Sequence, residues 1–226
     1  MKIGLVYAMT GEIESLLTQE NAQPLQTVAG VPFYRIRPDV IACAGGVSKV
    51  NAAMATQLLI SLYQPDLVLN AGVAGCFEDM PIGSIVLAEG FLQHDVDTSA
   101  LGDPVGLVST VNKVYFECDA HTVECIKTVV NEMDGVRGMI GPIASGDQFI
   151  SGAAIKEQIV GRFDAICCEM EGGAIAQVCC VNGVKCAVIR SMSDNADDDS
   201  HLDYGQFTRL AAAHSTQALC RLMEIL

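Results

Sequence analysis

The feature that most constrains the fold is a series of short apolar segments that alternate with segments of helical periodicity. Each apolar segment is rich in Val, Ile and Ala and is followed by Gly or a polar residue, which is typical of a buried strand. The predicted strands are Ile3 to Ala8, Val40 to Ala44, Asp66 to Asn70, Ser84 to Gln93, Arg137 to Ala144, Ala165 to Cys168 and Lys185 to Arg190. The predicted helices are Gly11 to Leu17, Val47 to Tyr63, Ala120 to Glu132, Ala153 to Arg162, Glu171 to Val181 and Tyr204 to Leu226.

This alternation predicts a single α/β domain over residues 1–226. Several strands are apolar on both faces, as in a sheet that helices cover on both sides. The stretch "TVAGVPFYRIRP" has Gly30 between two alternating runs and predicts a hairpin, and Ser151 is a candidate N-cap for the helix that follows it. We therefore predict a three-layer αβα fold with a central mixed, mostly parallel sheet.

Composition narrows the classes of function. With 50% hydrophobic and 18% charged residues, the chain can fill a large core. A net charge of -14 and only 13 Lys and Arg argue against a nucleic-acid partner. Glu12 and Glu14 end the N-terminal apolar run after about seven residues, which is too short for a signal peptide or a membrane span. We expect a cytoplasmic protein that acts on a small molecule and has no membrane partner.

Neither the cysteines nor the acidic clusters predict a metal site. Six of the ten cysteines lie in apolar patterns and are interpreted as small core residues: Cys43, Cys167, Cys168, Cys179, Cys180 and Cys186. The four histidines stand far apart, and "HDVD" at 94–97 is interpreted as a capping or interface segment. In "DNADDD" the Gly of a calcium loop is replaced by Asp199, so Asp197 to Asp199 is interpreted as a solvated cap before the last helix.

Polar motifs follow five of the predicted strands: "AMTGE", "NAGVAGC", "SGDQFI", "EMEGG" and "RSMSDNADD". Because ligands bind beyond the carboxyl ends of strands in such sheets, these motifs predict a pocket. "NAGVAG" lacks the third Gly of a dinucleotide loop, and a tight turn explains it equally well. Arg190 is the only Arg or Lys in the segments that follow the first, third and seventh predicted strands. Phosphorolysis and phosphoryl transfer are therefore disfavoured.

Five motifs in order, "VYAMTGEIE", "AGGVSKVNAAMAT", "SGDQFI", "CEMEGGAIAQVC" and "RSMSDNADDDSH", resemble the 5′-methylthioadenosine/S-adenosylhomocysteine nucleosidase family, within the purine nucleoside phosphorylase-like fold. The resemblance implies hydrolysis of an adenine N-glycosidic bond, which releases adenine and a 5-thioribose product. It implies no cofactor and no metal. Because the purine leaves poorly and the ribose becomes electron-poor, the enzyme must stabilise both halves of the transition state.

The resemblance also implies roles for three carboxyl groups. Asp194 matches the acid that donates a proton towards adenine N7, which requires a raised pKa. Glu12 matches the carboxylate that holds and activates the attacking water. Glu171 matches the residue that accepts hydrogen bonds from the ribose hydroxyls and favours the developing cation.

Other residues match the walls of the family's pocket. Phe149 would stack on adenine, the backbone of Ile150 would read its edge, and Met170 would pack on the ribose. Glu169 is interpreted as structural support. Met9, Val47 and Tyr204 would line the 5′-alkylthio part, and the remaining candidates for substrate binding are Val73, Ala74, Gly75, Arg190 and Ser193. The resemblance also implies a homodimer in which Asp95 to Gly106 of a second subunit closes the pocket.

The sequence departs from the family at a few positions. Val73 stands where the family usually has Ser or Thr, Gly11 replaces a second acidic residue, and "SALGDPVGLVST" lacks the aromatics common in relatives. The preferred 5′ substituent therefore stays open. Three alternatives also remain open: a nucleosidase for futalosine or adenosine, a purine nucleoside phosphorylase, and a binding protein that has lost turnover.

Overall fold

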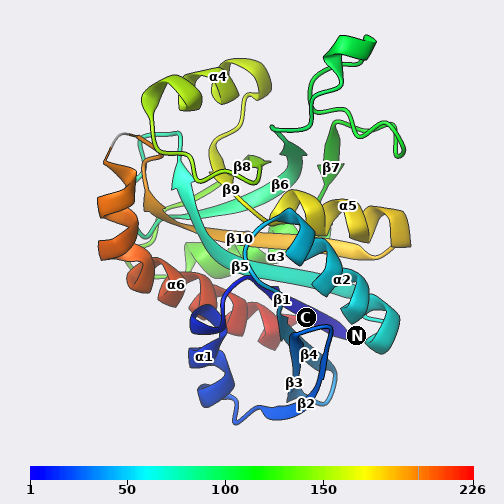
Figure 1. Cartoon of the computed structure of the whole chain (residues 1–226). Coiled ribbons are helices and arrows are strands. Elements are labelled where there is room, and N and C mark those ends of the chain that lie inside the picture. The colour runs from blue at the N-terminus through cyan, green and yellow to red at the C-terminus, as the bar shows by residue number, and fades with distance from the viewer. Residues whose placement is uncertain (198) are drawn as a thin grey trace.

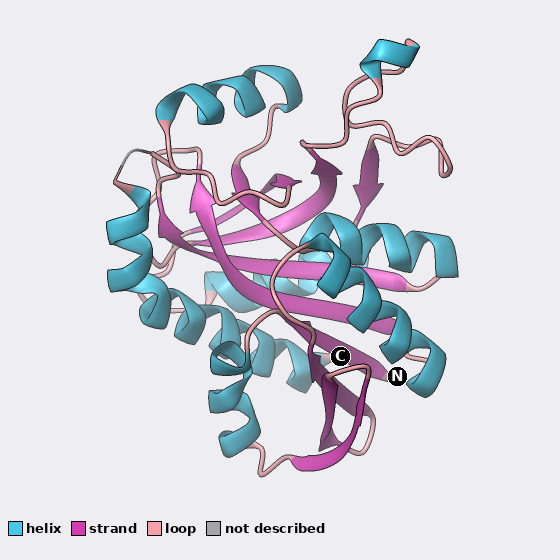
Figure 2. Cartoon of the chain, in the orientation of Figure 1, coloured by secondary structure: helices cyan, strands magenta, loops and turns pink. Residues whose placement is uncertain are grey.

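The computed structural model describes residues 1–197 and 199–226, apart from the side chain of residue 202. Figures 1 and 2 show the helices arranged around one central sheet. The strands are β1 (Ile3–Tyr7), β2 (Gln23–Val28), β3 (Val31–Arg37), β4 (Val40–Ala44), β5 (Leu67–Cys76), β6 (Ile85–Gln93), β7 (Tyr115–Glu117), β8 (Gly138–Ser145), β9 (Cys167–Glu169) and β10 (Lys185–Asp194). The helices are α1 (Thr10–Gln19), α2 (Lys49–Tyr63), the 3-10 turn η1 (Ser99–Leu101), α3 (Ala120–Asn131), α4 (Ala153–Phe163), α5 (Gly172–Asn182) and α6 (Ser200–Ile225).

The sheet is mixed, as predicted, and its strand order is β10-β6-β8-β9-β5-β1-β4-β3-β2, with β7 added to β6. β1 pairs in parallel with both β4 and β5, whereas β2, β3 and β4 form an antiparallel meander. β10 also pairs in parallel with β5. The strands β10, β6, β8, β9 and β5 therefore close into a ring, which removes the free sheet edges that these strands would otherwise expose.

Helices cover both faces of this sheet, as the predicted three-layer architecture requires. α2 packs against α5 on one face, and α1 and α3 pack against α6 on the other (Figure 1). Among the helices of the described residues, none is long and apolar enough to cross a membrane.

Two strands are longer than the sequence predicts. The stretch "NAGVAGC" is not a turn, because β5 continues through it to Cys76 while paired with β10. β10 likewise extends past Arg190 to Asp194. Each strand satisfies the other's backbone groups, so neither has to end at its glycines or polar residues. This extension places Val73, Ala74 and Gly75 inside a strand.

Two local predictions are wrong, and one strand is missing from the prediction. The N-cap of α4 is Gly152, at φ 155°, and the Ser151 hydroxyl instead donates to the Asp197 carbonyl oxygen at 3.3 Å. Cys180 is exposed, although the other five cysteines assigned to the core are buried and all ten cysteines are free. The short strand β7 was not predicted, because only its pairing with β6 defines it. Of the predicted cap Asp197 to Asp199, residue 198 lies outside the described residues.

Candidate active site

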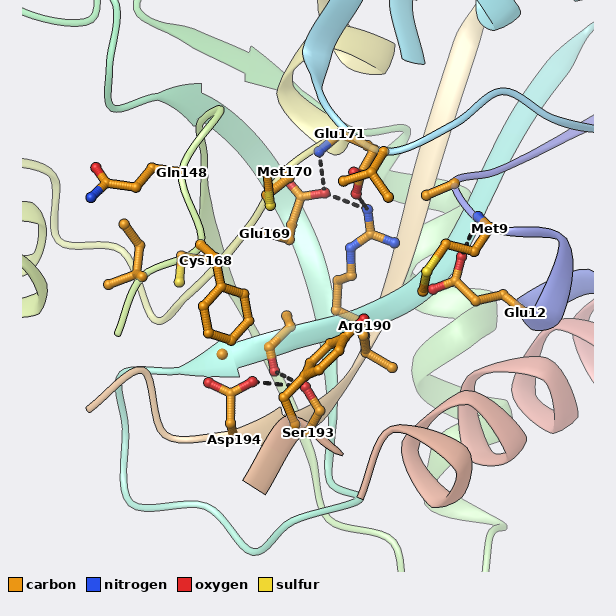
Figure 3. A pocket seen from close by; sticks show the side chains of 18 of the residues that line it. Met9, Glu12, Gln148, Cys168, Glu169, Met170, Glu171, Arg190, Ser193 and Asp194 are labelled. Atoms are coloured by element: carbon orange, nitrogen blue, oxygen red, sulfur yellow. Dashed lines mark hydrogen bonds and ion pairs between the residues drawn. The ribbon is translucent and has the colours of Figure 1, made fainter. Parts of the chain in front are cut away.

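A cavity of about 360 Å³ lies where the carboxyl ends of β1, β5, β9 and β10 meet the first turns of α1 and α6 (Figure 3). Every candidate site residue of the sequence analysis lines it: Met9, Glu12, Val47, Val73, Ala74, Gly75, Phe149, Ile150, Glu169, Met170, Glu171, Arg190, Ser193, Asp194 and Tyr204. The motifs that follow separate strands therefore form one site, as the rule for α/β sheets predicts.

Arg190 and Glu169 form an ion pair at the floor of the cavity. Arg190 Nη2 donates to Glu169 Oε2, and both side chains are almost completely buried. The same Oε2 accepts the backbone N–H groups of Glu171 and Gly172 at 3.0 and 2.7 Å, and Oε1 accepts the Ser145 hydroxyl. Glu169 thus caps the N-terminus of α5 and neutralises a buried cation, so its contacts are those of a structural support.

Glu171 points away from the cap that Glu169 forms, because the chain turns from β9 into α5 between the two residues. Its Oε1 accepts the Ser48 N–H at 2.9 Å, and its Oε2 lies 3.7 Å from Arg190 Nη2. Burial and the nearby charge of Glu169 raise the pKa of Glu171 to about 7, against the opposing effect of Arg190. Glu171 therefore lines the cavity with a carboxyl group whose Oε2 accepts no hydrogen bond from any of the described residues.

Glu12 lies on the first turn of α1, beside Met9 and on the other side of Arg190 from Glu169 (Figure 3). Its Oε2 accepts the Met9 N–H at 3.0 Å. Burial raises the pKa of Glu12, and the Met9 N–H and the charge of Arg190 oppose that rise. The carboxyl group is therefore held by one backbone donor and remains able to bind a further polar group.

Asp194 is the last residue of β10 and lies apart from Glu12 in Figure 3. Its Oδ2 accepts the Ser193 hydroxyl and its Oδ1 accepts the Ala196 N–H, both at 2.9 Å. Among the described residues no cation forms an ion pair with it. Burial raises the pKa of Asp194, and these hydrogen bonds oppose that rise only in part. Such surroundings favour the protonated form.

Two glycines of β5 make room for the charged groups. A Cβ on Gly72 would lie 2.5 Å from Arg190 Nη1, and a Cβ on Gly75 would lie 2.8 Å from Asp194 Oδ1. Both distances are far below contact, so any side chain at either position would displace the arginine or the acid. The glycines of "NAGVAG" therefore serve close approach within the sheet and bind no phosphate in this conformation.

Aromatic and apolar groups form the remaining walls. The rings of Phe149 and Tyr204 pack edge to face with centroids 5.5 Å apart. Ile150 is buried, Phe149 is 43% exposed, and both line the cavity. Flat apolar surface of this kind suits the face of a purine.

Four lining residues were not among the sequence candidates: Ala8, Gln148, Cys168 and His201. Gln148 lies inside the quoted motif "SGDQFI", so its place in that motif could have identified it. Within the described chain, no group of three or more His, Cys, Asp or Glu side chains is arranged to hold a metal ion.

Comparisons with known proteins agree with this geometry. The model of the phosphorylase superfamily matches residues 2–224. The 5′-methylthioadenosine/S-adenosylhomocysteine nucleosidase of Shewanella sp. (strain W3-18-1) is 38% identical over 229 residues, which cover 99% of this chain and 99% of that protein.

Solved structures also match over the whole chain. A mutant of the Helicobacter pylori nucleosidase MTAN with 5′-methylthioadenosine in its active site has a TM-score of 0.94 at 31% identity, covering 100% of this chain and 99% of that chain. Futalosine hydrolase of Helicobacter pylori strain 26695 has a TM-score of 0.94 at 32% identity, and the match covers 100% of this chain and 98% of that chain. The chain therefore belongs to the 5′-methylthioadenosine/S-adenosylhomocysteine nucleosidase family, within the phosphorylase superfamily.

Proposed function

We propose that this chain hydrolyses the N-glycosidic bond of 5′-methylthioadenosine and S-adenosylhomocysteine, releasing adenine and a 5-thioribose product. The observation that carries the proposal is the distribution of charge in the cavity. Asp194, which forms no ion pair with any of the described residues, lies apart from the three carboxyl groups around Arg190, those of Glu12, Glu169 and Glu171. A nucleoside placed between them would meet a proton donor at its base and negative charge at its sugar.

On the base side, adenine would pack on the Phe149 ring, and the Ile150 backbone would read its edge. Asp194 would donate its proton to N7 as the glycosidic bond breaks, so that adenine leaves as a neutral molecule. The raised pKa of Asp194 keeps this proton available at a higher pH than an exposed aspartate would.

On the sugar side, Glu171 would accept the ribose hydroxyls and Glu12 would hold the attacking water. The developing oxocarbenium ion is electron-poor, and nearby carboxylates lower its energy. Glu12 must be ionised to take a proton from the water, and the positive charge of Arg190 supports that state. Acid and base at opposite sides of the scissile bond are the arrangement of inverting glycosidases.

The same charges disfavour phosphate as the nucleophile. Among the described residues that line the cavity, Arg190 is the only Arg or Lys, and Glu169 and Glu171 already neutralise it. A phosphate dianion at this position would face Glu12 and Glu171 without a free cation to bind it.

The direct test is adenine release, followed by chromatography, from 5′-methylthioadenosine, S-adenosylhomocysteine and adenosine, with and without phosphate. We expect release from the two thio-nucleosides at a rate that does not depend on phosphate. Release that requires phosphate would establish a phosphorylase instead. If the protein binds adenine but releases none from any nucleoside, it is a binding protein that has lost turnover.

Futalosine is a second candidate substrate, because futalosine hydrolase of Helicobacter pylori matches this fold as well as the nucleosidases do. Val73 is consistent with a different substrate, because its methyl groups replace the hydroxyl that the family usually places near the sugar, so the contacts to the sugar differ from those of the family. Adding futalosine to the panel of nucleosides, with base release as the measurement, ranks it against the thio-nucleosides.

We also propose that residues 1–226 act as one nucleosidase domain in a homodimer. The segment around η1 projects from the sheet (green, top right in Figure 1), and Leu101 of η1 is 84% exposed. Val50 of α2 is 74% exposed as well. In a homodimer these two apolar side chains would be covered by the second subunit. Sedimentation equilibrium should give a dimer, and Leu101→Asp should weaken it. The cytoplasmic location stays a prediction from the sequence.

A further inference from the structure

Three residues from separate segments form a closed ring of polar contacts beside the cavity. The Lys49 N–H, at the start of α2, donates to Asp147 Oδ1 at 2.7 Å. The Asp147 N–H, after β8, donates to Asp95 Oδ2 at 2.9 Å. Asp95, two residues after β6, closes the ring, because its Oδ1 lies 2.6 Å from Lys49 Nζ. We refer to Lys49, Asp95 and Asp147 as the polar ring.

Two members of the polar ring, Lys49 and Asp147, are next in sequence to residues of the active site. Ser48, directly before Lys49, donates its N–H to Glu171 Oε1 at 2.9 Å. Gln148, Phe149 and Ile150, directly after Asp147, line the cavity. The ring therefore joins the residue that holds Glu171 to the wall proposed to bind adenine.

Ser48 has a backbone conformation that only fixed surroundings can maintain. Its φ of 88° and ψ of 162° lie in a region that is almost restricted to glycine. The N–H group of Ser48 is bound to Glu171, and the next N–H along the chain is bound to Asp147. These two contacts hold the strained residue so that its N–H points at the Glu171 carboxyl group.

Charge also favours the polar ring. Partial burial raises the pKa of Asp95, but the hydrogen bond from Lys49, the Asp147 N–H and the Lys49 charge outweigh that effect and lower it. The N-terminus of α2 presents two successive N–H groups to two carboxylates, which its dipole stabilises. Lys49 Nζ also donates to Gln93 Oε1 at 3.1 Å, and Gln93 Nε2 donates to Gln177 Oε1 on α5 at 2.6 Å. Since α5 begins directly after Glu171, this branch also stabilises the position of Glu171.

We propose that Lys49, Asp95 and Asp147 are positioning residues, which set the distance between Glu171 and the adenine wall at Phe149 and Ile150. The inference rests on the proposed function, because that function requires base and sugar to be held at once. None of the three needs to touch the reacting atoms. Their effect comes from alignment, where a displacement of about 1 Å can cost a hundredfold in rate.

The test compares Asp95→Ala and Asp147→Ala with Glu124→Ala, which removes an exposed carboxylate paired with Lys127 on α3. We expect kcat for 5′-methylthioadenosine to fall about tenfold to a hundredfold in the first two variants. The control should keep the wild-type kcat. Unchanged kcat in both ring variants, with the fold intact by circular dichroism, would overturn the proposal.

The pH dependence separates positioning from a general effect of charge. Glu171 is faced by Glu169, Arg190, Glu12, the Tyr204 phenol and the N-terminus of α2. Removing the negative charge of Asp147 would by itself lower the pKa of Glu171. Loss of the Ser48 N–H would raise it, because that contact favours the ionised form. We therefore expect the acidic limb of kcat/KM to move to higher pH in Asp147→Ala; a move to lower pH would contradict the proposal.

Two further measurements keep the proposal testable if the alanine variants do not fold or if the wild-type protein has no nucleosidase activity. If Asp95→Ala or Asp147→Ala does not fold, Lys49→Met opens the ring while it keeps the backbone donor, and kcat should still fall. If wild-type protein releases no adenine from any nucleoside, the proposed function is wrong. Calorimetry of adenine binding then tests the ring alone: Asp147→Ala should bind adenine several-fold more weakly than Glu124→Ala, and equal affinity would refute the role.

Discussion

The two ends of the active site contain the same functional group in opposite surroundings. Asp194 is buried at the end of β10 and is held by a hydroxyl and a backbone N–H, both uncharged. Glu169 and Glu171, also buried, share the guanidinium of Arg190. Burial raises the pKa of both Asp194 and Glu171, but among the described residues a positive charge opposes that rise through an ion pair at Glu171 and not at Asp194.

The comparison shows how one rim of a sheet can supply both an acid and anionic groups. Neutral donors leave Asp194 free to keep a proton, which a general acid needs. Arg190 permits negative charge to collect where a sugar would become positive. The position of one arginine therefore divides the work among the carboxyl groups.

Removing the shared cation should have the largest effect. Arg190→Met leaves the Glu169 carboxylate buried without its counter-ion, and we expect the free energy of unfolding to fall by about 3–5 kcal/mol. Urea denaturation measures the change. The control is Arg37→Met, which breaks the part-exposed pair with Glu20 and should cost less than about 1 kcal/mol. Equal losses in the two variants would mean that the buried cluster has no special dependence on its cation.

At the other end, Asp194→Asn removes the proton donor and keeps the shape. We expect transition-state stabilisation to fall by roughly 3 kcal/mol or more, which is a loss of at least about a hundredfold in kcat. Steady-state adenine release from 5′-methylthioadenosine measures it. Folding should be unaffected, since Asn Oδ1 can still accept the Ala196 N–H while its Nδ2 donates to the Ser193 hydroxyl, which can also act as an acceptor. A variant with near-normal kcat would show that the acid is another group.

Glu171→Gln tests the anionic end with a smaller expected loss. An amide still accepts hydrogen bonds, but it lacks the charge that strengthens them, so KM should rise and kcat/KM should fall about tenfold. If kcat and KM both stay at wild-type values, Glu171 has only a structural role.

The same variant should change the pH dependence of stability. The pKa of Glu171 is about 7 in the folded protein, above the ordinary value of 4.5 that the group has in the unfolded chain. The folded protein therefore binds the proton more tightly, and the stability contributed by this group is present below pH 4.5 and is lost as pH rises through 7. Glu171→Gln should be more stable than wild type at pH 8, by on the order of 1 kcal/mol, with no difference near pH 4. Thermal unfolding at the two pH values checks the sign.

Val73→Thr should have the smallest effect. Val73 lines the cavity between the two ends, and threonine has the same shape with a hydroxyl in place of a methyl group. If that hydroxyl reaches the ribose or the water, KM should fall by a factor that corresponds to less than about 1.5 kcal/mol. The comparison of 5′-thio and 5′-hydroxyl nucleosides shows which substrate gains. A rise in KM for every nucleoside would mean that the valine contributes apolar packing that the substrate needs.

Much of the site could be predicted because its residues follow strands that hydrophobic pattern alone identifies. Glu12, Glu171 and Asp194 each come after a short apolar run, and the carboxyl ends of such strands meet at one edge. The length of β5 could not be predicted in this way. Its continuation through "NAGVAGC" depends on pairing with β10, more than a hundred residues later in the sequence, and no local pattern contains that information.

The sequence by itself determined the α/β class, the order of the elements and the residue types at the rim, because these depend on periodicity and chain order. Only the tertiary structure decided which carboxyl group has which partner. Glu169 and Glu171 are two residues apart, yet the first caps α5 and pairs with Arg190, whereas the second binds the Ser48 N–H directly before α2. Hydrogen bonds and ion pairs depend on distances of a few ångströms between segments that are remote in sequence, and folding alone sets those distances.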